Sequence, residues 1–212
     1  FIRYSLSLSL LALAACNTCP DLAQQSSESA ATAWTDLSQQ SSWRGYKAKF
    51  VPEAWVIEDG VFHLTGQGTG GDLISSETYE SFELRLQWKI SPKGNSGIMF
   101  HVQEGEGPSY FTGPEIQVLD NAWFDEAEPN PKTSAGANYA LHGPPEDNTR
   151  PVGQWNDVLL IVNGNNVQHW MNDKLQCSYE LHSDSWKAAV AGSKFKQWPT
   201  YGMAKSGHIA LQ

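Results

Sequence analysis

The segment 82–90, FELRLQWKI, constrains the fold of this chain more than any other stretch. Apolar side chains occupy its even-numbered positions, and charged or amide side chains occupy its odd-numbered positions. A period of two residues places the two kinds on opposite faces of a β-strand. The segment therefore predicts a strand with one face in a core and the other in solvent.

Turn signals divide the rest of the chain into further short strands. Asp59-Gly60, Asn163-Gly164 and Asn172-Asp173 each separate two apolar or alternating runs, as β-hairpins do. Residues 95–104 and 208–212 also have the pattern of strands, whereas 183–195 is at most a short helix. Many short antiparallel strands with turn punctuation predict an all-β sandwich or jelly roll.

The length and net charge of the chain favour one globular domain that does not bind nucleic acid. The chain has 212 residues, 40% of them hydrophobic, which fits one globular domain and a short extra segment. Its net charge of −9, without a long basic run, argues against nucleic-acid binding. The chain has nine Trp, seven Tyr and eight Phe, and aromatic side chains serve either core packing or stacking on sugar rings.

The N-terminal segment has the pattern of a secretion signal. An apolar run at 6–15 follows Arg3 and is too short to span a bilayer. It ends at Cys16 in a lipobox-like sequence, so we expect lipidation of Cys16, with cleavage after 12–14 as the alternative. Either route predicts export, and lipidation predicts a membrane-anchored lipoprotein, periplasmic or in the outer membrane of a Gram-negative source.

The expected organisation is a signal peptide at 1–16, a Ser- and Gln-rich tether at 17–33 and a domain at 34–212. Because the chain starts with Phe1 and stops within an apparent strand at Gln212, we expect leader and C-terminal residues to be missing. Cys16 and Cys19 form a single CxxC without a second pair, which argues against a zinc site. Cys177 is expected to be an inert, half-buried thiol.

A polar strand face marks the candidate site. In the strand 113–121, GPEIQVLDN, Glu115 and Gln117 share one face, and Asp120 lies where the strand should end. If 95–104 is the neighbouring strand, parity brings His101 close to Glu115 and Gln117, and Gly97 leaves room for a ligand. The long segments 104–114 and 121–153 flank this strand. Carboxylates and imidazoles exchange protons, although a solvated outer face is the alternative.

A second group of candidates lies in 167–172. Trp170 and Asn172 share a face and offer an indole and an amide, which suit contacts with sugar. His169 lies on the other face among apolar residues. It is either an imidazole at the edge of the core, bonded to the backbone, or a catalytic group.

Several blocks together resemble the 3-keto-disaccharide hydrolase domain family, which has a concanavalin A-like jelly-roll fold and is common in bacterial lipoproteins. The blocks, in order, are NSGIMFHV, TGPEIQVLDN, PVGQWNDVLLIVNGNNVQHWMNDK, VAGSKF and GHIALQ. The resemblance covers about residues 34–212. In that family the last block continues into an Asp-His-Gly stretch and a final strand, both absent here.

The resemblance implies hydrolysis of glycosides that are already oxidised at C3 of the sugar. A base removes the C2 proton, the C1 substituent leaves by elimination, and water adds to the product. A separate sugar 3-dehydrogenase would supply the substrate. The alternative is a non-catalytic carbohydrate-binding jelly roll. A conventional endo-glucanase is disfavoured because its E-x-D-x-x-E signature is absent.

Roles follow from block position and parity. Glu115 is the first choice as general base or metal ligand, Asp120 is a ligand or orients a histidine, and His101 carries a proton or contacts the enolate. His169 is held in reserve as a catalytic residue. The expected substrate contacts are Gln117, Trp170, Asn172 and Asn95. A divalent cation bound by Glu115 and Asp120 could polarise the ketone, and this stays open.

Overall fold

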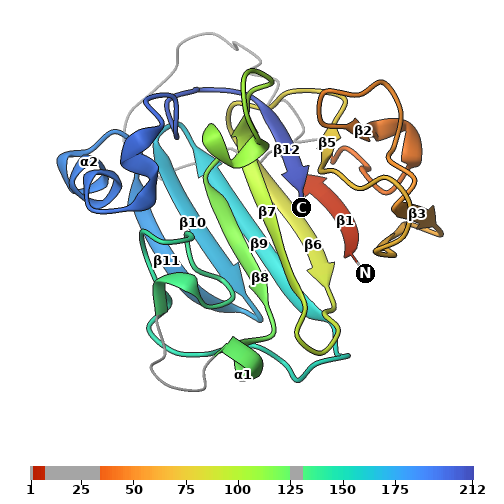
Figure 1. Cartoon of the computed structure of the whole chain (residues 1–212). Coiled ribbons are helices and arrows are strands. Elements are labelled where there is room, and N and C mark those ends of the chain that lie inside the picture. Colours follow the sequence, from red (N-terminus) through yellow and green to blue (C-terminus); the bar gives the residue numbers. More distant parts are fainter. Residues whose placement is uncertain (1, 8–33, 125–130) are drawn as a thin grey trace, which may run out of the picture.

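The computed structural model describes residues 2–7, 34–124 and 131–212, which form two antiparallel β-sheets packed face to face (Figure 1). One sheet has seven strands in the order β11-β10-β9-β6-β1-β4-β3, and the other has five in the order β2-β5-β12-β7-β8. The strands are β1 Ile2–Ser7, β2 Trp43–Gly45, β3 Trp55–Glu58, β4 Val61–Leu64, β5 Leu73–Ser75, β6 Phe82–Trp88, β7 Asn95–Val102, β8 Glu115–Leu119, β9 Asn156–Asn163, β10 Asn166–Met171, β11 Lys174–Glu180 and β12 His208–Leu211. The predicted all-β jelly-roll class is confirmed.

The alternating segment forms β6, with its even-numbered residues buried between the sheets. It pairs with β9 over seven residues, from Phe82↔Val162 to Trp88↔Asn156. The predicted hairpins are also present. Asp59 and Gly60 join β3 to β4 with φ angles of 50° and 71°, and Asn172 and Asp173 join β10 to β11 with φ angles of 49° and 64°.

Helices are few among the described residues. They are α1 Asn121–Phe124, α2 Asp184–Ala191, and four 3-10 turns: η1 Gln40–Ser42, η2 Ser109–Phe111, η3 Pro131–Thr133 and η4 Lys194–Gln197. The expected short helix is α2, and Ser183 caps it by accepting a hydrogen bond from the Trp186 amide at 3.1 Å. None of the helices in the described part of the chain could cross a membrane.

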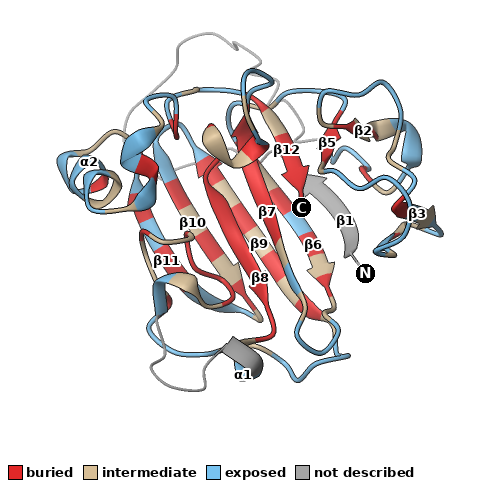
Figure 2. Ribbon diagram, in the orientation of Figure 1, coloured by how far each residue is buried: buried red, intermediate tan, exposed pale blue. Residues whose placement is uncertain are grey.

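The core lies between the two sheets, where Figure 2 shows buried residues running along the strands. Its largest fully buried side chains include Trp88 and Phe62 from one sheet and Phe100 from the other. A smaller apolar cluster lies on the opposite face of the five-stranded sheet and contains Met99 and Ile74. That second cluster shows that the outer face of this sheet is covered too, and the site lies there.

Residues 2–7, which the sequence assigns to the leader, form β1 between β6 and β4. All six residues pair with β6, whereas Ile2 alone pairs with β4, opposite Phe62. Cys16, the predicted tether and the rest of the leader lie outside the described residues. Export and lipidation stay predictions.

Candidate functional site

Strand β8 presents its polar residues on the outer face of the five-stranded sheet. Ile116 and Val118 belong to the core between the sheets, so Glu115 and Gln117 point the other way. The neighbouring strand β7 places Met99 opposite Glu115 and Gly97 opposite Gln117. Glu115 and Gln117 therefore share one face of β8, as the two-residue period predicts.

Glu115 is a buried carboxyl at the start of β8. Only 6% of the residue is exposed, and no described residue donates a hydrogen bond to its carboxyl oxygens. Burial raises the pKa of Glu115 to about 7, against the opposing effect of the Lys194 charge. A carboxyl with this pKa exchanges protons near neutral pH, as a general base or acid must.

Gly97 makes room for this carboxyl. A Cβ atom at Gly97 would overlap Oε1 of Glu115 and would lie 2.7 Å from its Cδ atom. The Glu115 side chain therefore lies directly over the backbone of β7, where any other residue would displace it.

A second carboxyl lies on the same face. Ser109 donates a hydrogen bond to Asp72 and also approaches the Met99 sulfur at 3.5 Å, which places Asp72 beside the outer face of β7. Burial raises the pKa of Asp72, and the Asp72 charge contributes to the raised pKa of Glu115. The two carboxyls thus interact electrostatically across this face.

A lysine from a different part of the chain faces Glu115. The Lys194 ammonium, at the start of η4, lies 4.3 Å from the ring centroid of Tyr139 and 5.8 Å from that of Tyr110. The backbone amide of Tyr139 bonds to the Glu115 carbonyl at 3.0 Å, so the segment carrying Tyr139 runs along the free edge of β8. We refer to Glu115, Asp72, Lys194, Tyr139 and Tyr110 as the Glu115 site.

Stacked aromatic rings hold η4 against the sheets. Four successive ring pairs are within 20° of parallel, at centroid separations of 3.8 to 6.0 Å. The rings, in order, are His142, Tyr179, Trp186, Tyr201 and Phe195. Because Phe195 follows Lys194 directly, this stack fixes the position from which Lys194 reaches the site.

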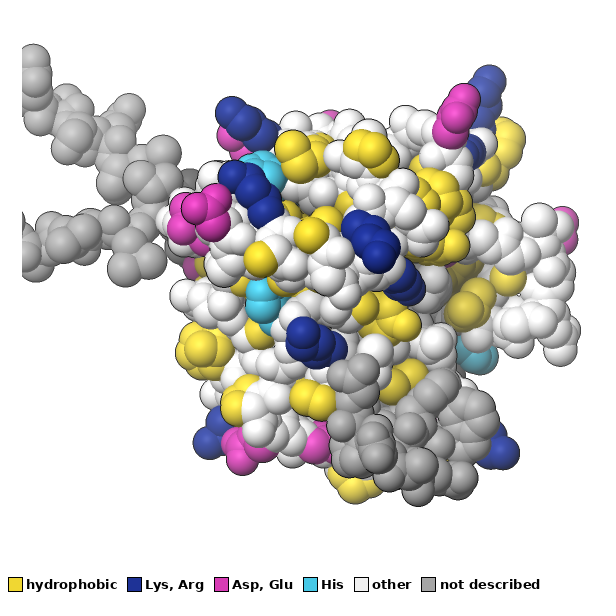
Figure 3. All heavy atoms as spheres, turned by 60° about the vertical axis from the view of Figure 1, so that its left-hand side comes forward, with side chains coloured by type: hydrophobic (Ala, Val, Ile, Leu, Met, Phe, Trp, Pro, Cys, Tyr) yellow, Lys and Arg dark blue, Asp and Glu magenta, His cyan; other side chains and the backbone are white. Residues whose placement is uncertain are grey.

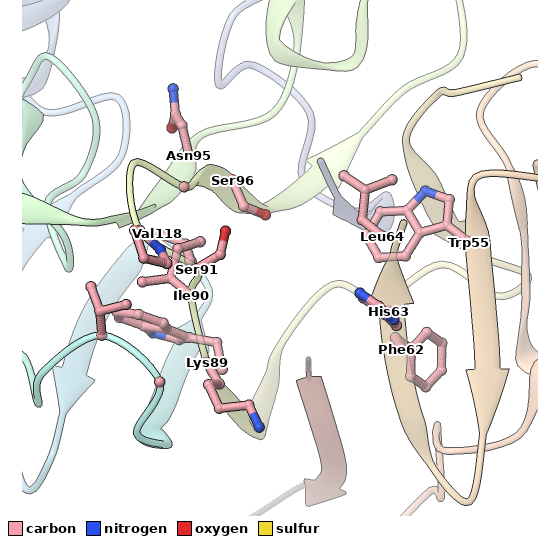
Figure 4. A pocket seen from close by; sticks show the side chains of 15 residues that line it. Trp55, Phe62, His63, Leu64, Lys89, Ile90, Ser91, Asn95, Ser96 and Val118 are labelled. Atoms are coloured by element: carbon pink, nitrogen blue, oxygen red, sulfur yellow. The ribbon is translucent and has the colours of Figure 1, made fainter. Parts of the chain in front are cut away.

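Gln117 and Asn95, both predicted substrate contacts, lie next to each other. The Gln117 amide nitrogen donates to the Asn95 side-chain oxygen at 3.2 Å. Asn95 also lines a pocket of about 360 Å³ between the start of β7 and the β3–β4 hairpin, with Trp55, His63 and Ser96 (Figure 4). That pocket has no carboxylate among its lining residues, whereas the Glu115 site has two.

His101 does not join the Glu115 site, so its predicted proximity to Glu115 and Gln117 is wrong. Ala210 pairs with Met99 but His208 pairs with Val102, so β7 carries one extra residue, and His101 has φ 53°. This bulge reverses the parity beyond it. The imidazole Nε2 lies 2.8 Å from the Glu80 carbonyl oxygen, and the ring contacts Phe82 of the other sheet.

Asp120 is also placed away from Glu115. Its Oδ2 accepts a hydrogen bond from the Lys93 amide at 2.8 Å, and its own amide donates to Gly94 at 3.0 Å, so it secures the turn before β7. Five residues of extended strand, about 16 Å, separate Glu115 from Asp120, so the two cannot hold one metal ion. In the part of the chain that is described, no three His, Cys, Asp or Glu side chains form such a cluster.

The remaining candidates lie in the other sheet. His169 is fully buried, with Nε2 2.9 Å from the Tyr179 hydroxyl, and burial lowers its pKa to about 3. Of the two alternatives, the core imidazole is the one observed. Trp170 donates a hydrogen bond to Gln168 at 2.9 Å on the outer surface of the seven-stranded sheet. Asn172, in the β10–β11 turn, accepts a hydrogen bond from the Asp157 amide and donates one to the Asn148 carbonyl. Neither contacts the Glu115 site.

Sequence reasoning missed Lys194, Asp72, Tyr110 and Tyr139. Lys194 lies 79 positions after Glu115 in the sequence. It belongs to a 3-10 turn, so the two-residue alternation of a strand does not predict which way its side chain points. The available signal for Lys194 is its place in the block VAGSKF, which belongs to the family resemblance. Asp72 and the tyrosines carry no comparable signal.

Comparison with known proteins agrees with this architecture. A curated 3-keto-disaccharide hydrolase from Bacteroides thetaiotaomicron is 35% identical over 181 residues, covering 75% of this chain and 62% of the relative, so the chain spans less than two thirds of that protein. A candidate glycosyl hydrolase from Parabacteroides distasonis superposes with a TM-score of 0.72 at 28% identity, covering 81% of this chain and 82% of its own. A second structure from that organism has a TM-score of 0.62 at 22% identity, covers 80% and 90%, and supports the fold alone.

The family model described as the 3-keto-alpha-glucoside-1,2-lyase-like domain matches residues 32–212. That range contains the five-stranded sheet and every residue of the Glu115 site. The family expected from the sequence blocks is confirmed, and the chain belongs to the 3-keto-alpha-glucoside-1,2-lyase-like domain family.

Proposed function

We propose that this chain hydrolyses the glycosidic bond of 3-keto glycosides, including 3-keto-disaccharides. The observation that carries the proposal is Glu115, a buried carboxyl that no described group bonds and whose pKa is about 7. Family membership supports the substrate class, because the related protein from B. thetaiotaomicron is named a 3-keto-disaccharide hydrolase. A strongly perturbed carboxyl in an apolar setting is typical of a catalytic group.

The chemistry follows from the ketone. A carbonyl at C3 acidifies the C2–H bond, because the electron pair left at C2 can delocalise onto the C3 oxygen. A base takes the C2 proton, the electrons then form the C1–C2 double bond, and the C1–oxygen bond breaks with protonation of the leaving oxygen. Water adds its hydroxyl to C1 and a proton to C2. A 1,2-elimination followed by hydration is a net hydrolysis, which reconciles the lyase in the family description with the hydrolase in the relative's name.

Two carboxyls divide the proton transfers in this proposal. Glu115 accepts the C2 proton, since its raised pKa makes it a stronger base than an exposed carboxylate. Asp72, whose pKa burial also raises, protonates the leaving oxygen, and Ser109 orients it. Gln117 and Asn95 hold sugar hydroxyls through their paired amides.

Export and anchoring are part of the proposal but depend on the sequence motif at Cys16. We also propose that a separate sugar 3-dehydrogenase supplies the 3-keto glycoside. Cys16→Ala is expected to abolish labelling of the expressed protein with a radioactive fatty acid, and retained labelling would contradict the anchor.

The decisive assay is NMR of a 3-keto-disaccharide incubated with the protein. We expect free sugars to appear with the wild type and turnover to fall by a factor of about 10² to 10⁴ in Glu115→Gln. Glu180→Gln, which changes an exposed carboxyl on β11, is the matched control and should retain full turnover. Line broadening of the substrate without product would favour the non-catalytic binding module instead.

A further inference from the structure

Lys194 is a cation that faces Glu115 without pairing with it. Burial lowers the pKa of Lys194 and raises that of Glu115, and the charge of each group opposes the shift of the other, so the two groups interact. Among the described residues, however, every ion pair within 4.0 Å involves other side chains. Lys194 lies over the ring of Tyr139, whose backbone amide bonds the Glu115 carbonyl, so the ammonium is close to Glu115 without a direct contact with its carboxyl.

Two tyrosine rings hold the ammonium in this place. Its Nζ atom lies over the faces of Tyr139 and Tyr110, at 4.3 and 5.8 Å from the ring centroids. Cation–π contacts attract the ammonium without occupying its N–H donors as a carboxylate would. The donors thus stay available for an oxygen atom placed between Lys194 and Glu115.

The surroundings favour a negative charge at that position. The end of the molecule that carries α2 and η4 shows Lys and Arg side chains across its middle, while most Asp and Glu lie nearer its margins (Figure 3). Lys187, Lys194 and Lys196 are all exposed in this segment. Glu115 is buried on the sheet beneath and Asp72, just before β5, is half-buried, so a developing anion on the ligand would face the ammonium.

We propose that Lys194 is a catalytic residue that donates a hydrogen bond to the C3 oxygen of the sugar and stabilises the enolate formed when Glu115 takes the C2 proton. This inference rests on the proposed function. In a 3-keto sugar the acidic hydrogen and the ketone oxygen are on adjacent carbons, so the base and the cation must approach the sugar from different directions. A carboxyl from β8 and an ammonium from η4 meet this requirement.

The test separates enolate formation from bond cleavage. A 3-keto sugar without an exocyclic oxygen at C1, 1,5-anhydro-3-ketoglucitol, can lose its C2 proton but has no glycosidic bond to break. In D₂O, NMR should show that the wild type exchanges C2–H and leaves C4–H, although both hydrogens adjoin the ketone. Lys194→Met should slow this exchange and the kcat for 3-keto-disaccharide hydrolysis by a factor of about 10² to 10³, with little change in KM.

Two further variants make the result specific. Lys194→Arg keeps the charge and the N–H donors and should retain part of the exchange rate, whereas Lys196→Met on the same turn should behave as wild type. Borohydride added during turnover should leave the mass of the protein unchanged. A covalent adduct on Lys194 would instead show that Lys194 forms an imine with the ketone, which would contradict the hydrogen-bonding role.

The outcomes distinguish a failure of the proposed function from a failure of the role of Lys194. A wild-type protein that neither exchanges C2–H nor releases sugar would refute the proposed function itself. A wild type that does both, together with a Lys194→Met variant that keeps its exchange rate, would refute the role of Lys194 and leave the proposed function intact.

Discussion

Replacing Glu115 by glutamine should stabilise the protein at alkaline pH and have little effect at acid pH. Burial raises the pKa of Glu115 from 4.5 to about 7 in the folded protein. At a pH between these two pKa values, the folded chain therefore keeps a proton on Glu115 that the unfolded chain has released. The contribution of Glu115 to stability is therefore greatest below pH 4.5 and is lost as the pH rises toward and through 7.

The magnitude follows from the two pKa values. Each pKa unit corresponds to about 1.4 kcal/mol, so ionising Glu115 should cost the folded state about 3 kcal/mol between pH 4 and pH 8. A glutamine has the shape of the protonated carboxyl and no charge to desolvate. The free energy of unfolding of Glu115→Gln minus that of the wild type should rise by this amount across the same range.

Urea unfolding at half-unit pH intervals, followed by tryptophan fluorescence, measures this difference. Glu104→Gln is the comparison of opposite sign, since the Arg44 guanidinium lowers the pKa of Glu104 to about 2. In the wild type, the ionised Glu104 stabilises the folded state above pH 4.5, and this stabilisation is lost as the pH falls toward 2. A Glu115→Gln difference that is flat with pH would show that the carboxyl is solvated, and the catalytic argument would lose its basis.

Three other variants test the site assignments. Gly97→Ala should displace the Glu115 carboxyl and lower kcat by at least about tenfold, while the unfolding free energy changes by less than about 1 kcal/mol; normal turnover would contradict the placement of Glu115. His169→Ala should cost roughly 3 kcal/mol in urea unfolding, because it leaves the Tyr179 hydroxyl buried without a partner, and the folded fraction should keep its kcat; a selective loss of kcat would restore the catalytic alternative. Trp170→Ala should leave kcat/KM for the 3-keto-disaccharide unchanged, and a large fall would mean that substrate reaches the other sheet.

The sequence predicted well wherever a period of two residues continued without interruption. In β6 and β8 the alternation of side chains is the alternation of faces, so both the core residues and the outward direction of Glu115 could be predicted. The same reasoning failed at His101, because one extra residue in β7 reverses every later face. A bulge formed by a residue other than glycine leaves no mark in the sequence.

Parity also does not identify the sheet to which a strand belongs. Trp170 and Asn172 share a face in the sequence, but β10 lies in the sheet opposite the one that carries Glu115. Lys194 shows that a residue outside every strand can also belong to the site. Its turn, η4, is held there by ring stacking that involves Phe195 and Tyr201. Contacts of this kind depend on tertiary packing, and no local pattern near Lys194 encodes them.

Glu115 and Gln117 together show why the carboxyl indicates function and not folding. The two side chains lie on the same face of the same strand, with 6% and 4% of each residue exposed. Gln117 is neutral and bonds Asn95, so this part of the fold accommodates an amide that has a partner. Glu115 has no such partner among the described residues, and its ionisation opposes folding by about 3 kcal/mol. A glutamine at position 115 would fill the same space over Gly97 at lower free energy, so stability alone does not account for a carboxyl there. Transfer of a proton does, because it requires a group that can be both charged and neutral at the pH of the reaction.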